Sequence, residues 1–368
     1  MAVLISQCSN LVQKIHNNDV SEFFISTLST NMNFNSINLI KSFRLTRFVA
    51  QSVALCSLTM MGFNAHSADA EWPTKPITLI IPFATGGTTD IIGREVGQKL
   101  SEALKQPVLI DNRPGAGGNL AAGMVSKAAP DGYTLLLSTV AHAMAPGLYK
   151  SLSYNFIQDF EPIAMVATTP NILIVNPKLP VKTVPELIAY IKANPNTVNF
   201  GSAGSGSTEH LSGELFKSMT NLQITHIPYK GGAPMMTDLM GGQIQMAIET
   251  SPSATPHIQS GKVRALGVTG MSRSSVFPDV PTLNESGVKG YEVTTWYALM
   301  APKGLSPSIE ARLSSELSKV LKNPELLKHF AEQGVTAGNQ KSTQLGDFIK
   351  AETSKWAKVA KDSGAVVD

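Results

Sequence analysis

The sequence predicts an α/β protein built from two similar lobes that face each other across a cleft. Two observations support this fold class. Ile77–Pro82 is a short apolar run rich in β-branched residues, typical of a buried strand, and a glycine-containing loop and an apolar helical stripe follow it. The same order of strand, loop and helix returns from Thr197 onward. We interpret this as an architectural duplication, although little sequence identity accompanies it.

The first copy contains the loop Ala84–Asp90, in which Gly86 and Gly87 can adopt positive φ and expose their amides. A helix is predicted from about Thr89, because apolar residues recur at helical spacing as far as Leu104. The unpaired amides of its first turn and the positive end of its dipole point toward the loop. This arrangement predicts an anion-binding site.

The second copy contains the strand Thr197–Gly201, the loop Ser202–Thr208 and a helix marked by buried-type residues from Leu211. Ligands of such sheets bind at the carboxyl ends of the strands, so the two loops would face each other across the cleft. The elements that follow the two loops also correspond. They are the strand Val108–Asp111, a helix ending near Pro130 and the strand Tyr133–Leu137 in the first copy, and the strand Leu222–Ile227, a helix over Met235–Met240 and the strand Gln243–Ile248 in the second.

The chain is predicted to pass between the lobes twice and so to form a two-stranded hinge. Asn171–Val175 is an apolar strand that leads into the second lobe, and Tyr291–Pro302 is a strand that leads back. Two consecutive helices without a strand between them, starting near Ser306 and Thr343, would then pack on the first lobe. The predicted boundaries are 71–171 plus 297–368 for the first lobe and 172–296 for the second.

The N-terminal region is predicted to lie outside the fold. Three basic residues and the apolar run Phe48–Met61 precede small residues that end at Ala70, which predicts a cleaved signal peptide over 37–70. The run is too short for a stable membrane span, although an N-terminal anchor is the alternative. Residues 1–36 are expected to be a leader of unknown role. The alternative is that the start codon is wrongly assigned and that translation begins at Met32.

Composition excludes several classes of function. Both cysteines, Cys8 and Cys56, lie in the segment to be removed, so the exported protein would have no disulfide or cysteine-based site. The formal net charge is only +3, and no basic run with interleaved aromatic residues occurs, so nucleic-acid binding has little support. No apolar stretch of spanning length follows Ala70, so the mature protein is expected to be soluble.

A series of short motifs resembles those of the tripartite tricarboxylate transporter receptors, also called Bug receptors. Each motif is weak alone, but their order from Trp72 almost to Asp368 makes the resemblance specific. The motifs are Trp72-Pro73-x-Lys75-Pro76-Ile77, Gly86-Gly87-x-x-Asp90, Asn112-Arg113-Pro114-Gly115-Ala116-Gly117-Gly118, Pro130-Asp131-Gly132-Tyr133-Thr134-Leu135, Gly201-Ser202-Ala203-Gly204-Ser205-Gly206-Ser207, His226-Ile227-Pro228-Tyr229-Lys230-Gly231, Asp238-Leu239-Met240-Gly241-Gly242-Gln243 and Phe277-Pro278-Asp279-Val280-Pro281-Thr282.

The resemblance implies a periplasmic-binding-protein-like fold of type II, a two-lobed Venus flytrap. It implies a periplasmic receptor that holds a small carboxylate through main-chain amides and water, and delivers it to the integral-membrane permease subunits of a transporter. A monomer is the default expectation for a receptor that docks on one permease. No cofactor, metal or catalytic residue is implied. Glu249 stands where the family commonly has Asp, which leaves open whether it meets an amine or shrinks the pocket. The implied ligand-binding residues are Phe83, Ala84, Gly86, Gly87, Thr88, Thr89, Asp90, Ser138, Ser202, Gly204, Ser205, Gly206, Ser207 and Glu249.

Other interpretations of these residues remain open at this point. Asp90 can cap its helix or pair with Arg94 one turn along, and both glycine loops can be simple turns. The aromatic pair Trp296-Tyr297 is expected to pack in the core, and a place in the wall of the cleft is the alternative.

Other functions also remain open. The second loop approaches a phosphate-binding P-loop, but Ser207 stands where the lysine should be. A hydrolase remains as a remote alternative, and a receptor of the same fold that feeds a sensor kinase remains as a nearer one.

Overall fold

The computed structural model describes residues 72–363. The predicted leader 1–36, the predicted signal peptide 37–70 and both cysteines lie outside the described residues. In the part of the chain that the structure describes, no helix combines the length and the apolar character needed to cross a bilayer.

The first lobe has a central strand with a parallel partner on each side. β1 (Ile77–Ile81) pairs with β2 (Val108–Asn112) and with β3 (Thr134–Thr139). The apolar side chains of Ile77 and Leu79 pack with the buried face of the helix that follows β1. Because helices cover both faces of such a sheet, its strands are nearly continuous apolar runs. The helices are α4 (Thr88–Leu104), the short 3-10 helix η1 (Ala116–Gly118), α5 (Asn119–Val125) and α6 (Val140–Leu148).

The second lobe repeats this plan. β5 (Asn199–Ser202) lies between β6 (Thr225–Pro228) and β7 (Met246–Thr250), and all three are parallel. The strand order β6-β5-β7 matches the order β2-β1-β3 of the first lobe, which confirms the predicted duplication at the level of topology. The helices are α7 (Val184–Ala193), α8 (Thr208–Thr220), α9 (Gly232–Gly241) and α10 (Ser251–Gln259).

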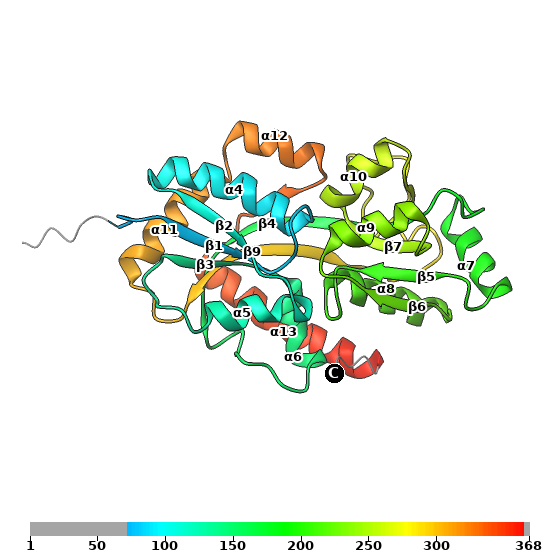
Figure 1. Ribbon diagram of the computed structural model, residues 1–368, viewed down its shortest axis with the longest axis horizontal. Helices are drawn as coiled ribbons and strands as arrows, with labels where there is room; N and C mark the ends of the chain where they lie inside the picture. The colour runs from blue at the N-terminus through cyan, green and yellow to red at the C-terminus, as the bar shows by residue number, and fades with distance from the viewer. Residues whose placement is uncertain (1–71, 364–368) are drawn as a thin grey trace, which may run out of the picture. The chain divides into compact units, whose positions relative to one another are not determined.

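Two long strands join the lobes, as predicted. β4 (Phe160–Val175) pairs antiparallel with β9 (Thr294–Pro302) along its first part, and with β7 and β8 (Arg264–Val268) along 171–175. A single strand therefore belongs to the sheets of both lobes. β9 brings the chain back and lies between β3 and β4. Figure 1 shows β4 and β9 running from one group of elements to the other.

The C-terminal region returns to the first lobe through α11 (Pro307–Val320), α12 (Pro324–Glu332), β10 (Thr336–Ala337) and α13 (Ser342–Ser363). α11 packs on α4 and α13 packs on α6, so the predicted return is confirmed. The prediction of two helices without a strand between them is wrong. Asn323 interrupts the region, because its side chain caps α12, and β10 then pairs antiparallel with β4.

Three further details differ from the sequence prediction. α5 ends at Val125 and not near Pro130, because the amides of Lys127 and Ala128 bond to carbonyls only three residues back, which tightens the chain into turns. α6 and α10 follow the ends of β3 and β7, where no helix was predicted. Both of these helices contain an internal proline, which weakens the helical signal in the sequence.

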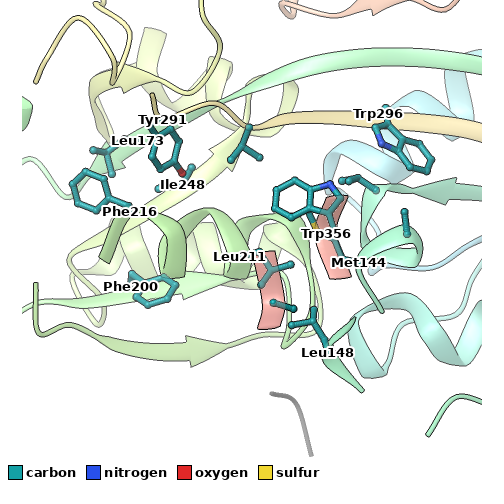
Figure 2. Packing of buried hydrophobic residues seen from close by; sticks show 14 of the residues in the cluster. Met144, Leu148, Leu173, Phe200, Leu211, Phe216, Ile248, Tyr291, Trp296 and Trp356 are labelled. Atoms are coloured by element: carbon teal, nitrogen blue, oxygen red, sulfur yellow. The ribbon is translucent and has the colours of Figure 1, made fainter. Parts of the chain in front are cut away.

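A hydrophobic cluster extends through the hinge into both lobes. Phe200 and Tyr291 belong to its part in the second lobe, whereas Trp296 of β9 and Trp356 of α13 belong to its other part (Figure 2). The indole N–H groups of both tryptophans donate to Glu352, at 3.1 and 3.0 Å. The apolar core thus anchors the hinge strands.

Candidate ligand site between the two lobes

Two loops at the carboxyl ends of β1 and β5 contribute to the candidate site. Residues 83–87 lead from β1 into α4, and residues 203–207 lead from β5 into α8. Gly86 and Gly206 have φ of 85° and 82°, a left-handed conformation in which a side chain would be strained. Each helix therefore begins directly after a tight turn, and its first-turn amides point out of the helix end.

A small cavity lies between the lobes. Its volume of about 20 Å³ would hold about one water molecule. The two lobes and the hinge strand β9 all contribute to its wall. A metabolite would therefore have to enter while the lobes are apart. The lining residues are Phe83, Gly87, Thr88, Thr89, Thr139, Ala203, Thr208, Glu209, Gly232, Glu249, Thr250, Thr295 and Tyr297.

The end of the first predicted loop lies at this cavity. Phe83 also packs with Ala141 and Ala203, which makes a small apolar contact between the lobes. Ala84 lies outside the lining, and its amide donates to the carbonyl of Lys230 in the other lobe at 3.2 Å. The predicted residues that line the cavity are Phe83, Gly87, Thr88, Thr89 and Glu249.

Asp90 makes the local contacts that are expected if it supports the loop and does not touch the ligand. Its carboxylate accepts the amide of Gly86 at 2.9 Å and the side-chain amide of Asn112 at 3.0 Å, and it forms an ion pair with Arg94 at 2.9 Å. Burial raises the pKa of this carboxyl, but the hydrogen bonds from Arg94, Gly86 and Asn112 outweigh burial and leave the pKa lowered. The charged side chain therefore holds the first loop in shape, behind the cavity wall.

The second predicted loop contacts the other lobe at a different place. The hydroxyl of Tyr149 donates to the carbonyl of Ser205 at 2.8 Å. Gly117 packs so closely that a Cβ atom there would collide with the same carbonyl. Ser207 caps α8 by accepting the amide of His210 at 3.3 Å. This loop thus docks against η1 and the end of α6.

The remaining polar groups of the second loop bond within the second lobe. The hydroxyl of Ser202 accepts the amide of Gly204 at 3.1 Å and lies 2.6 Å from Nε2 of His226. The amide of Gly206 donates to Nδ1 of His210 at 3.1 Å. Burial lowers the pKa of His226 to about 3, so this imidazole is neutral at physiological pH. These histidines support the loop.

Sequence reasoning missed eight residues of the cavity wall, of which four stand directly beside a predicted one. Ser138 was predicted, but its hydroxyl donates to the carbonyl of Ala298 at 3.1 Å, and its neighbour Thr139 lines the cavity. Tyr297 was assigned to the core, and it is both buried and part of the lining. The residues not predicted are Thr139, Ala203, Thr208, Glu209, Gly232, Thr250, Thr295 and Tyr297.

A chain of hydrogen bonds connects the lobes at the cavity. The amide of Ser253 donates to Oγ1 of Thr88 at 3.1 Å, and Thr250 donates through Oγ1 to Oε1 of Glu249 at 2.6 Å. The two threonine hydroxyls are 2.6 Å apart. Because the proton of Thr250 is already used, Thr88 is the donor between them. The start of α4 is therefore linked to the carboxyl of Glu249 in the opposite lobe.

Two carboxyl groups lie buried at this cavity. Glu249 is only 1% exposed, and its Oε2 has no hydrogen-bond partner among the described residues. Burial, followed by the charge of Glu209, raises the pKa of Glu249 to about 8. Burial also raises the pKa of Glu209, against hydrogen bonds from its own amide and from Ser207. Within residues 72–363, no group of three or more His, Cys, Asp or Glu side chains is arranged to hold a metal ion.

Replacing Thr88 by valine is expected to weaken closure of the lobes. The change keeps the shape of the side chain but removes the hydroxyl, which leaves the buried amide of Ser253 without its acceptor. Losing a buried partner of this kind costs about 1–3 kcal/mol. Thermal unfolding would show a lower Tm for Thr88→Val. The control Thr237→Val removes a hydroxyl that bonds only within α9. Equal Tm values for the two variants would contradict the bridging role of Thr88.

Comparison with known proteins identifies relatives over most of the chain. The family described as "Tripartite tricarboxylate transporter family receptor" matches residues 92–365. Protein BugT of Bordetella pertussis is 40% identical over 301 residues, which cover 81% of this chain and 92% of BugT.

Solved structures with the same fold also match. Rpa4515 of R. palustris, solved with adipate, is 38% identical with a TM-score of 0.78, and the match covers 80% of this chain and 100% of that one. MatC (Rpa3494) of Rhodopseudomonas palustris, solved with bound malate, is 31% identical with a TM-score of 0.76. This match covers 78% of the present chain and 100% of MatC. The periplasmic binding protein BugD is 34% identical with a TM-score of 0.78, and the match covers 80% of the present chain and 99% of BugD.

Proposed function

Because this chain belongs to the tripartite tricarboxylate transporter family of receptors, we propose that it is a periplasmic receptor that binds a small carboxylate and delivers it to a membrane transporter. The observation that carries the proposal is the cavity between the lobes, whose wall includes the first residues of both α4 and α8. Helix N-termini present unpaired amides and a partial positive charge, which stabilise a carboxylate. No covalent step is needed for this function.

The relatives solved with adipate and with malate support a small carboxylic acid as the ligand class. Hydrogen bonds to a charged acceptor contribute roughly 1.5–3 kcal/mol each. When the donors come from both lobes, the ligand binds the closed state more tightly than the open state and so shifts the equilibrium toward closure. The ligand-binding residues that we propose are the predicted residues at the cavity, Phe83, Gly87, Thr88, Thr89 and Glu249, together with Thr139, Thr208, Glu209, Thr250 and Tyr297 from the cavity wall.

Delivery requires export and a partner. We propose that the signal peptide 37–70 directs the chain to the periplasm and that the closed, loaded receptor docks as a monomer on the permease subunits. Lobe boundaries near residues 171 and 297 fit this cycle. They fall close to the position where β4 changes pairing partners, after Pro170, and within β9. Opening of the lobes at these strands would then release the ligand.

A thermal-shift screen tests the binding step. Protein freed of ligand by unfolding and refolding is expected to show a higher Tm with one or a few members of a panel of mono-, di- and tricarboxylates that includes adipate and malate. A ligand at 100 times its Kd stabilises the folded state by about 2.7 kcal/mol. If no carboxylate raises the Tm, the proposed binding function is wrong.

Uptake by a deletion strain tests the transport step. Cells that lack this chain are expected to lose uptake of the carboxylate found in the screen and to regain it on complementation. Normal uptake together with loss of a transcriptional response to the same compound would instead indicate the sensor-linked alternative.

A further inference from the structure

The cavity wall is asymmetric in charge. Glu209 and Glu249 both line it from the second lobe, and no Lys, Arg or His occurs among its described lining residues. Oε1 of Glu249 accepts both the amide and the hydroxyl of Thr250, at 2.9 and 2.6 Å, whereas Oε2 is buried without a partner. If Glu249 were ionised, this buried oxygen would need a hydrogen-bond donor, which a ligand could supply.

The donors on the two sides of the cavity are not equivalent. On the second lobe, Glu209 lies in the first turn of α8, and its buried side chain lines the cavity. The start of α8 therefore presents a carboxyl group to the cavity. The start of α4 also carries an acidic residue, but the carboxylate of Asp90 bonds to Gly86, Asn112 and Arg94 and is not part of the cavity lining. On the first lobe, Gly87, Thr88 and Thr89 present the start of α4 to the same space. A ligand would thus meet hydrogen-bond donors on one wall and two carboxyl groups on the other.

We propose that the ligand is a small zwitterion, with its carboxylate at the start of α4 and an ammonium group between Glu209 and Glu249. This inference rests on the proposed function and narrows the class of carboxylate. An ammonium group has three donors and no acceptor, which matches an unpartnered carboxylate oxygen beside a second carboxyl. A second carboxylate on the ligand would instead place three acidic groups together and require them to retain protons.

Binding of an ammonium group at this site is expected to release a proton. The titratable groups that line the cavity are Glu209, Glu249 and Tyr297, and burial raises the pKa of the tyrosine, which stays neutral. Without a cation, the pKa of Glu249 of about 8 keeps a proton on this pair at neutral pH. A bound ammonium favours the ionised pair, so the proton leaves to the buffer as the ligand binds. A dicarboxylate would cause uptake or retention of protons.

Isothermal titration of ligand-free receptor with matched compounds tests the inference. Glutamate differs from glutarate, and β-alanine from propionate, by an ammonium group. In at least one pair, the ammonium compound is expected to bind about 10-fold or more tightly, which corresponds to about 1.4 kcal/mol. Repeating the titration near pH 7 in buffers of different ionisation enthalpy is expected to show proton release.

Two variants test the site. Glu249→Gln and Glu209→Gln are each expected to lose most of the preference for the ammonium compound, whereas Glu292→Gln, at an exposed position, is expected to keep it. If one variant fails to fold, the other variant and the proton release of the unmodified chain still test whether an ammonium group binds at this site. Tighter binding of the compounds without ammonium, or an unchanged preference in both variants, would overturn the inference. Failure of every carboxylate to bind would overturn the receptor function on which it rests.

Discussion

Replacing Glu249 by glutamine is expected to make the protein more stable at pH 8 and to flatten the dependence of its Tm on pH. The carboxyl is buried, and burial together with the charge of Glu209 raises its pKa from an ordinary value near 4.5 to about 8. The folded state therefore holds a proton that the unfolded chain releases. The stabilising contribution is complete below about pH 4.5 and is lost as the pH rises toward 8.

The size of this effect follows from the shift in pKa. Each pKa unit corresponds to about 1.4 kcal/mol, so a few kcal/mol of stability would be lost across this range. Glutamine stays neutral, and its oxygen can still accept the two hydrogen bonds from Thr250. Differential scanning calorimetry at about pH 5 and pH 8 measures the difference, with Glu292→Gln as the control. Parallel Tm profiles for the two variants would show that the Glu249 carboxyl does not hold a proton in the folded state.

Replacing Gly117 by alanine is expected to hold the lobes apart and to weaken ligand binding by about 10-fold or more. The new methyl group would collide with the carbonyl of Ser205 in the other lobe, which is part of the backbone and cannot turn away. The hydroxyl of Tyr149 lies at the same contact and donates to this carbonyl. Because the proposed ligand contacts both lobes, separation of the lobes removes its contacts with one of them.

A matched variant separates this effect from backbone strain. Gly117 has φ of 62° and Gly261 has φ of 70°, so alanine is similarly strained at both positions, but nothing lies near the position of a Cβ atom at Gly261. Small-angle X-ray scattering is expected to show a larger radius of gyration for Gly117→Ala than for Gly261→Ala. An unchanged radius of gyration and unchanged affinity in Gly117→Ala would contradict the role of this contact in closure.

Local signals in the sequence were sufficient for much of the fold. The apolar run from Ile77 predicts a strand because buried parallel strands favour continuous apolar residues. Its counterpart, Thr197–Gly201, is less apolar and is recognised through the repeated order of strand, loop and helix. Glycine-containing turns followed by helical stripes predict α4 and α8. The matching strand orders of the two lobes then confirm the duplication. The sequence did not predict α6 and α10, because an internal proline weakens the helical signal of each. It also missed the break at Asn323, whose side chain caps a separate helix, α12.

The candidate site was predicted only in part. Gly87, Thr88 and Thr89 lie at the cavity because they follow a tight turn at the end of a strand, which is a local feature. The resemblance implied main-chain amides as the donors to the ligand, whereas the structure also places the hydroxyl of Thr88 in contact with Thr250 and Ser253 across the lobes. Glu209 stands beside the second predicted loop, but the sequence carries no signal of its approach to Glu249.

The amino-acid sequence alone determined the α/β class, the two lobes, the two crossings between them and the two loops at helix starts. These features depend on hydrophobic periodicity, on glycine and on capping residues, all of which act over a few neighbouring positions. Only the tertiary structure decided that one loop end lines the cavity while the other loop docks on Gly117 and Tyr149, and that two glutamates share one buried space. Those contacts join residues far apart in the chain, and their energies depend on burial and on distance, which no local pattern encodes.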